Sequence, residues 1–106
     1  MTTFSTHVLD TTAGVPAAGV PVTLERASGG GWETVASGRT DADGRLREWV
    51  AAADWSAGRY RITFDTAGRS AFFPEVSVVF EVADPGRHLH VPLLLSPFGY
   101  TTYRGS

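Results

Sequence analysis

The chain has 106 residues, a length that favours one domain spanning 1–106, and its formal charge of −2 does not suggest a nucleic-acid or membrane partner. It contains no Cys and no Lys, which excludes disulfides, thiolate catalysis, cysteine-ligated metals and Schiff-base chemistry. Because Asn and Gln are also absent, catalytic groups must come from His, Arg, Asp, Glu, Ser, Thr and Tyr. The first residues do not resemble a signal peptide and no apolar run approaches a membrane span, so we expect a cytoplasmic protein.

Alternating apolar and polar residues predict strands along the whole chain. The first, residues 4–9, places Phe4 and Val8 on one face and Ser5 and His7 on the other. Turns rich in Gly, Pro and Asp separate it from seven further predicted strands, at 20–25, 32–37, 46–50, 59–65, 74–83, 88–95 and 100–103, and a helical turn is compatible with 51–57. Eight short strands with turns between them predict an all-β fold, an antiparallel β-sandwich.

Three histidines are predicted to point away from the core of this sandwich. The apolar face of the strand at 88–95 is formed by Leu89, Val91, Leu93 and Leu95. His88 and His90 therefore lie on its outer face, as His7 does on the first strand. The outer faces of both strands carry few charges, which is typical of a groove or a subunit interface, although plain surface histidines are the alternative. Two imidazoles can share acid and base roles near neutral pH, whereas neither strand supplies the carboxylate that a metal site would need.

A turn with two aspartates precedes the strand at 46–50. Its sequence, Asp41-Ala-Asp-Gly-Arg45, predicts side-chain capping of the turn and a glycine at positive φ. It lacks the downstream Glu of a calcium loop, so a calcium site is not expected. Arg45 is held next to a tight turn, where its guanidinium can be presented to an anion or a polarised carbonyl, while Arg47 is expected to be solvated. There is no G-x-S-x-G sequence, which leaves a serine hydrolase without support.

Three blocks of the sequence match a known family over almost the whole chain. They are 5–10 with 14–19, then 40–45, and finally 73–75 with the long segment 88–106 that ends in Tyr-Arg-Gly-Ser. In these blocks the chain resembles the transthyretin-like 5-hydroxyisourate hydrolases, whose hallmark is that final tetrapeptide. Departures from the family pattern occur at Asp41, Leu89 and Thr101 and in the shortened segment 66–71, where we expect the family's helix to be reduced to a turn.

The resemblance implies a fold, an assembly and an active site. The fold is a prealbumin/transthyretin-like sandwich of two four-stranded sheets, and the assembly is a homotetramer, a dimer of dimers, with sites where outer sheet faces of different subunits meet. No metal and no organic cofactor is implied. The implied catalytic residues are His7, Arg45, His90 and Ser106, and the implied substrate-binding residues are His7, Arg45, His90, Tyr103 and Arg104.

The implied reaction is hydrolysis of 5-hydroxyisourate to 2-oxo-4-hydroxy-4-carboxy-5-ureidoimidazoline in urate degradation. In this hypothesis the His7/His90 pair, in contact with Ser106, activates water for attack on a cyclic amide, and Arg45 orients the ring and stabilises negative charge. One alternative is a non-catalytic small-ligand carrier on the same sandwich, and another is a structural or adhesive domain, because fold alone does not determine function.

Overall fold

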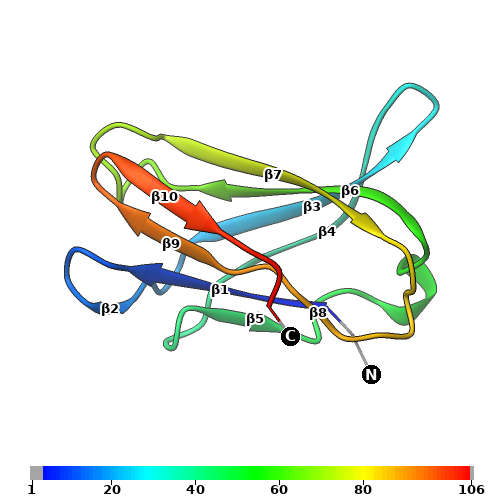
Figure 1. Cartoon of the computed structure of the whole chain (residues 1–106), viewed down its shortest axis with the longest axis horizontal. Coiled ribbons are helices and arrows are strands. Elements are labelled where there is room, and N and C mark those ends of the chain that lie inside the picture. The colour runs from blue at the N-terminus through cyan, green and yellow to red at the C-terminus, as the bar shows by residue number, and fades with distance from the viewer. Residues whose placement is uncertain (1–3, 106) are drawn as a thin grey trace.

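Two β-sheets enclose one apolar interior in the computed structural model, which describes residues 4–105 (Figure 1). The only helical element among these residues is the 3₁₀ turn η1, Ala52–Asp54, inside the predicted 51–57. The strands are β1 (Phe4–Asp10), β2 (Val15–Pro16), β3 (Pro21–Ser28), β4 (Gly31–Arg39), β5 (Arg45–Arg47), β6 (Gly58–Asp65), β7 (Glu75–Val82), β8 (Leu89–His90), β9 (Leu93–Ser96) and β10 (Gly99–Thr102).

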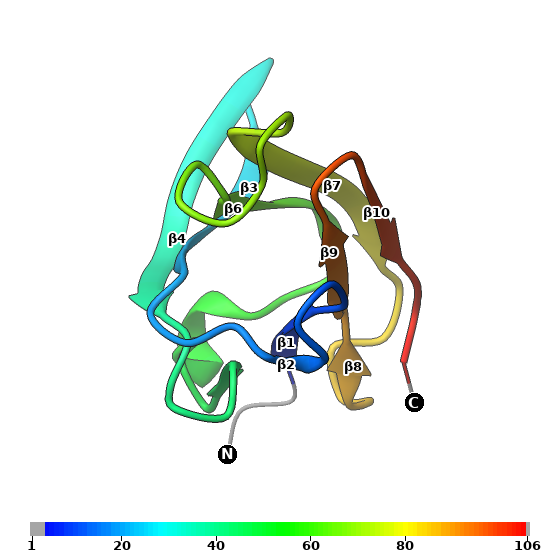
Figure 2. The ribbon, with the colours of Figure 1, turned by 90° about the vertical axis from the view of Figure 1, so that its left-hand side faces the viewer.

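The predicted antiparallel β-sandwich is confirmed, but the expectation of two four-stranded sheets holds for only one of them, because β1 also pairs with the short strands β2, β5 and β8 in the other. One sheet has four antiparallel strands in the order β4-β3-β6-β7. The other has six strands, in the order β10-β9-β1-β2, with β5 and β8 also paired to β1. Within it, β1 runs parallel to β8 and β9. The view along the strands shows the two layers facing each other across the interior (Figure 2).

The predicted strand at 88–95 is divided in two. Proline has no N–H to donate to a strand ladder, and Pro92 follows Val91 at the point of the break. Both halves still pair with β1 in one register, since Ser5 lies opposite His90 and Val8 opposite Leu93. The division therefore interrupts the ladder without shifting either face of the strand.

The predicted strand at 46–50 is also shorter than expected. It ends after Arg47, because Glu48 adopts a φ of 53°, in the left-handed region that does not continue a strand. The segment 66–71 forms a turn, as expected, with Thr66 and Ser70 joined by a backbone hydrogen bond. Within residues 4–105, no helix has the length and apolar character needed to cross a membrane.

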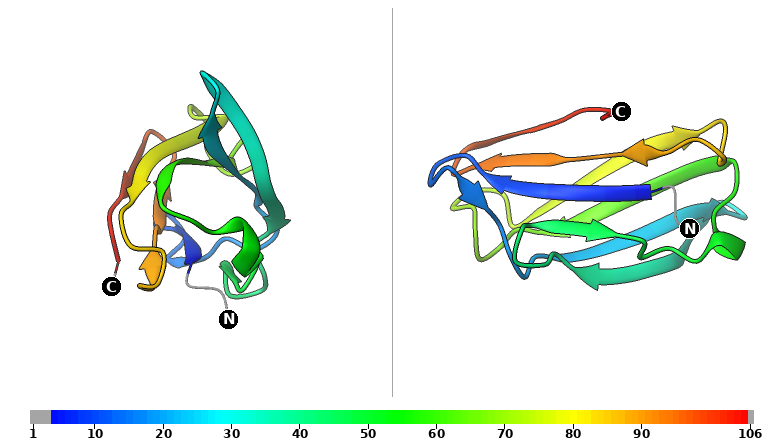
Figure 3. Two further views of the ribbon diagram at one scale, coloured as in Figure 1. Left: turned by 90° about the vertical axis from the view of Figure 1, so that its right-hand side faces the viewer. Right: turned by 90° about the horizontal axis from the view of Figure 1, so that it is seen from below.

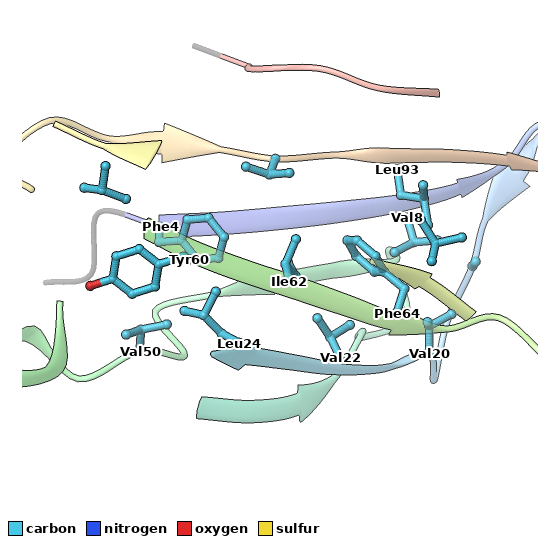
Figure 4. Packing of buried hydrophobic residues seen from close by; sticks show 14 of the residues in the cluster. Phe4, Val8, Val20, Val22, Leu24, Val50, Tyr60, Ile62, Phe64 and Leu93 are labelled. Atoms are coloured by element: carbon cyan, nitrogen blue, oxygen red, sulfur yellow. The ribbon is translucent and has the colours of Figure 1, made fainter. Parts of the chain in front are cut away.

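The core lies between the inner faces of the two sheets (Figure 4). It follows the predicted alternation, because Phe4 and Val8 of β1 are at most 1% exposed and face Leu24 of β3 and Ile62 of β6, both fully buried. At one end of the core, Phe4 stacks on Phe80 with ring centroids 5.5 Å apart. Burying a large apolar side chain contributes about 1.5–3 kcal/mol. These contacts fix which face of β1 is internal. His7 and the other residues on the opposite face of β1 therefore project outward.

Candidate active site

Strand β1 lies between β5 and the β8–β9 run, as seen from below in Figure 3 (right), where β1 is blue, β5 green and β8–β9 orange. His7 of β1 is paired with Arg45 of β5, and Ser5 of β1 is paired with His90 of β8. Paired residues on neighbouring strands project to the same face of a sheet. The outer face of this sheet therefore carries His7, Arg45 and His90 on three adjacent strands.

The turn before β5 is built tightly against β1. The carboxylate of Asp41 accepts hydrogen bonds from the backbone N–H groups of Asp43 (2.8 Å) and Arg45 (3.0 Å), as the sequence predicted. Both hydrogen bonds lower the pKa of Asp41, and the bond from the N–H of Arg45 has the larger effect, so the carboxylate remains charged. Gly44 has a φ of 74°, and a Cβ there would lie 2.5 Å from the carbonyl oxygen of Val8. Only glycine fits this approach, which holds Arg45 at the start of its strand.

His7 is oriented by the same turn. Its Nε2 lies 2.9 Å from the carbonyl oxygen of Asp43. Because a carbonyl can only accept, Nε2 carries the proton and the lone pair of neutral His7 is on Nδ1. Burial, followed by the charge of Arg45, lowers the pKa of His7, so the ring is a neutral potential base near neutral pH.

His90 is held by different groups. Its Nδ1 lies 2.9 Å from the hydroxyl oxygen of Ser5, whose side chain is largely buried. The backbone N–H of Gly105 donates to the carbonyl of His90 (2.7 Å), and a Cβ on Gly105 would lie 2.7 Å from Cδ2 of the imidazole. The glycine of the C-terminal segment therefore packs directly on the ring. Burial, and then the charge of His7, lowers the pKa of His90.

Tyr103 and Arg104 lie on the segment that leads to Gly105. Both side chains are exposed, and both line a hollow of about 230 Å³ that also contains Phe80 and Leu89, at the open edge between the sheets. Arg104 also lines a second hollow with Arg87 and His88. The structure thus groups His7, Arg45 and His90, and places Tyr103 and Arg104 beside the edge of the sandwich. The predicted residue Ser106 lies outside the described residues.

Three groups of the site were not among the residues singled out from the sequence. They are the hydroxyl of Ser5, the carbonyl of Asp43 and the Cα of Gly105. Ser5 shares the outward face of β1 with His7, so the strand periodicity held a signal for it. Asp43 acts through its backbone carbonyl, for which residue type gives no signal. At position 105 the glycine is itself a signal, because a Cβ there would meet the imidazole of His90.

The arrangement favours acid–base chemistry on an anionic or polarised ligand. Two neutral imidazoles lie beside a guanidinium, which attracts developing negative charge and repels cations. Within residues 4–105, no group of three or more His, Cys, Asp or Glu side chains is placed to hold a metal ion. Two imidazoles next to the positive charge of Arg45 are a poor match for Ca²⁺ or Mg²⁺, which prefer oxygen ligands.

Fold and site together define a transthyretin-like β-sandwich with a His/Arg cluster on its outer face. The profile of the HIUase/Transthyretin family matches residues 4–105, and the chain belongs to that family. It is 47% identical over 118 residues to the uric acid degradation bifunctional protein TTL of Arabidopsis thaliana, covering 96% of this chain but only 36% of that protein. It is 42% identical to the 5-hydroxyisourate hydrolase of Caulobacter vibrioides over the full length of both chains.

Two solved structures of this family, a 5-hydroxyisourate hydrolase and a transthyretin, superpose closely on the chain. The 5-hydroxyisourate hydrolase of Klebsiella pneumoniae superposes with a TM-score of 0.84 at 41% identity, with 100% of both chains covered. Sea bream transthyretin, solved in complex with thyroxine, gives a TM-score of 0.89 at 35% identity and covers 96% of this chain and 93% of its own. The likeness in fold therefore extends to a transthyretin solved with thyroxine, whereas sequence identity is higher to the hydrolase.

Proposed function

We propose that this protein hydrolyses 5-hydroxyisourate to 2-oxo-4-hydroxy-4-carboxy-5-ureidoimidazoline in urate degradation. Relatives named 5-hydroxyisourate hydrolase match nearly the whole chain, at 43% identity for the Salmonella typhi protein. The observation that carries the proposal is the grouping of His7, Arg45 and His90 on three adjacent strands, with both imidazoles oriented by hydrogen bonds.

In this proposal the histidine pair activates water. The water oxygen attacks the carbonyl carbon of the cyclic amide, and an imidazole takes the proton that the water loses. The carbonyl electron pair moves to oxygen, where the guanidinium of Arg45 stabilises it. Collapse of the tetrahedral intermediate breaks the C–N bond, and the leaving nitrogen takes a proton. Base catalysis contributes about 10²–10⁴-fold and one oxyanion donor about 10²–10³-fold, so a rate gain of this size needs no metal.

The proposal includes an assembly, a homotetramer arranged as a dimer of dimers. β7 is an eight-residue strand at the edge of its sheet, and Val79 on it is 54% exposed. β10 is the edge of the other sheet, and Tyr100 on it is 43% exposed. A long edge strand such as β7 is normally covered by pairing, and β10 offers a second, shorter open edge. Sedimentation analysis tests the homotetramer. If the protein is a monomer, no site can form where the outer sheet faces of different subunits meet.

Several finer assignments belong to the same proposal. We assign Tyr103 and Arg104 to substrate binding and Ser106 to catalysis together with His7, Arg45 and His90. The 1–106 segment is treated as one domain, since the family profile extends over 4–105. A cytoplasmic location rests on the sequence alone, and cell fractionation tests it.

The carrier alternative is not favoured. Sea bream transthyretin supports it, because that protein was solved with thyroxine and has the same fold. A carrier, however, has no need for two imidazoles fixed in defined orientations next to a guanidinium.

The decisive experiment generates 5-hydroxyisourate with urate oxidase and follows its decay by ultraviolet absorbance. We expect the purified protein to accelerate this decay in proportion to its concentration. An unchanged decay rate with correctly folded protein would eliminate the enzymatic function and leave the carrier.

A further inference from the structure

Ser5 and His88 are two polar residues behind His90 that the reaction described above does not use. The hydroxyl oxygen of Ser5 lies 2.9 Å from Nδ1 of His90 and 3.3 Å from Nε2 of His88. His88 and His90 are two residues apart, so both side chains are directed to the face on which Ser5 lies. One largely buried hydroxyl thus stands between two imidazoles, of which His88 is exposed to solvent.

A serine hydroxyl can serve both imidazoles at once. It has one proton to donate and lone pairs with which to accept. When it accepts from Nδ1–H of His90, it can donate to Nε2 of His88. In that state the free lone pair of His90 is on Nε2, the nitrogen that Ser5 does not contact. The hydrogen bonds then connect half-buried His90 with exposed His88 through one hydroxyl.

We propose that His88 and Ser5 form a proton relay behind His90 during hydrolysis of the cyclic amide. The inference rests on the proposed function. As water attacks, its proton passes to Nε2 of His90, the Nδ1 proton of His90 passes to the oxygen of Ser5, and the hydroxyl proton of Ser5 passes to Nε2 of His88. His90 and Ser5 remain neutral, and the positive charge is held on His88.

The relay runs backwards when the intermediate collapses. The C–N bond breaks, its electron pair goes to nitrogen, and the nitrogen takes the Nε2 proton of His90. His88 returns its proton through Ser5 to Nδ1 of His90, which restores the starting tautomers. The new carboxylic acid loses its remaining proton to solvent, so all protons are accounted for.

Charge placement is the physical reason for such a relay. A positive charge on His90 would stand beside His7 and the guanidinium of Arg45, and the pKa of His90 is lowered by burial and by these neighbours. His88 is exposed, where water stabilises an imidazolium. The hollow at His88 is also lined by Asp84 and by Glu81, whose carboxylate is paired with Arg59. The other charged groups near the relay are Arg47, opposite Ser5, and Arg87 and Arg104, which line the hollows at His88.

Three single variants of the full chain test the relay in the 5-hydroxyisourate assay. We expect Ser5→Ala to lower kcat by about 10–100-fold, as for other groups that orient a functional imidazole. His88→Gln should lower kcat by about 10-fold at low buffer concentration, with recovery when imidazole is added as a small proton acceptor. Ser77→Ala is the matched control, because its hydroxyl bonds to Thr63 on the outer face of the other sheet; it should match the wild type. Circular dichroism confirms that each variant is folded.

Nitrogen-15 NMR of the imidazoles provides a readout that a purely structural role would not move. The chain has only three histidines, which makes assignment direct. We expect neutral His90 and His88 both to carry the proton on Nδ1, and Ser5→Ala to abolish this preference in His90. A protonated Nε2 on His90 in the wild type would overturn the relay.

The kinetic outcomes separate the relay from the proposed function. A wild type that does not accelerate the decay removes the function and the relay together. An active wild type with an unchanged kcat and pH profile in His88→Gln removes only the relay, and a defect confined to Ser5→Ala would reduce the hydroxyl to orienting His90.

Discussion

The two sheets of this protein differ in regularity, and that difference separates the scaffold from the site. In the four-stranded sheet every strand has eight or nine residues and pairs antiparallel over most of its length. In the six-stranded sheet the strands have two to seven residues. Two of its short strands end at residues that do not continue a strand. β8 ends next to Val91 and Pro92, which has no N–H to donate, and β5 ends at Glu48, whose φ lies in the left-handed region. His7, Arg45 and His90 of the candidate site all lie on this irregular sheet.

The two sheets therefore have different roles in the molecule. The regular sheet supplies Leu24, Ile62 and Phe64 to the core, all fully buried. The irregular sheet brings side chains from three separate parts of the sequence onto adjacent strands, and short strands with tight turns permit that. Variants in the irregular sheet should change activity more than stability, and core variants in the regular sheet should do the reverse.

The largest effect is expected for His90→Asn in the irregular sheet. Asparagine cannot accept a proton near neutral pH, so kcat should fall by about 10²–10⁴-fold. Because His90 lies on the outer face, thermal unfolding should shift little. The measurements are the 5-hydroxyisourate assay and a calorimetric melt, and full activity in the variant would remove His90 from the mechanism.

Arg45→Ala should lower kcat/KM by about 10²–10³-fold and also change its pH dependence. The charge of Arg45 contributes to lowering the pKa of both His7 and His90, after burial in each case. In the wild type both imidazoles become neutral at a pH below their ordinary pKa of about 6.5. The acid limb of the pH profile of kcat/KM therefore lies below that pH. Without Arg45 both pKa values rise, and the acid limb moves to higher pH. A limb that stays in place, or moves to lower pH, would contradict this electrostatic coupling.

Leu24→Ala tests the opposite side of the comparison. Leu24 of the regular sheet is fully buried, and truncating a buried leucine costs about 2–5 kcal/mol of the free energy of unfolding. The midpoint in urea should fall by a corresponding amount. Activity per folded molecule should remain near the wild-type value, and a large drop in kcat at full folding would show that the two sheets are coupled.

Arg59→Ala should have the smallest effect of the four. Arg59 and Glu81 form a hydrogen-bonded ion pair of 2.7 Å on the outer face of the regular sheet, and both side chains are 61% exposed. Exposed pairs of this kind contribute about 0–1 kcal/mol. Stability and kcat should both stay close to wild type. A loss of several kcal/mol would indicate that this face is covered in the assembly.

The sequence predicted the regular sheet more completely than the irregular one. Strict alternation of Val76, Val78, Phe80 and Val82 identified β7 and its inner face, because one buried face imposes a period of two. The early end of β5 depends on the φ of Glu48, a single backbone feature that a residue pattern does not encode. The break between β8 and β9 lies at Pro92, a residue whose effect on a strand the alternation alone does not show.

For the candidate site the situation was similar. Outward placement of His7 and His90 followed from periodicity, and the structure bears out that placement. Arg45 was singled out by its place after a tight turn and again by the family resemblance, but its position beside His7 depends on the pairing of β5 with β1. The contact of His90 with Ser5 required the parallel pairing of β1 with β8, and its contact with Gly105 required a separate antiparallel bridge. Sequence periodicity does not specify which segments become neighbours.

The hydrogen bond between Ser5 and His90 joins residues 85 positions apart in the chain. Closing a loop of that length must precede the contact, and folds dominated by such distant contacts form slowly. During synthesis the regular sheet can pair once β7 has left the ribosome, while β1 still lacks two of its partner strands, β8 and β9. Catalytic competence should therefore appear only after β8 and the segment with Gly105 have been synthesised, later than the pairing of the regular sheet.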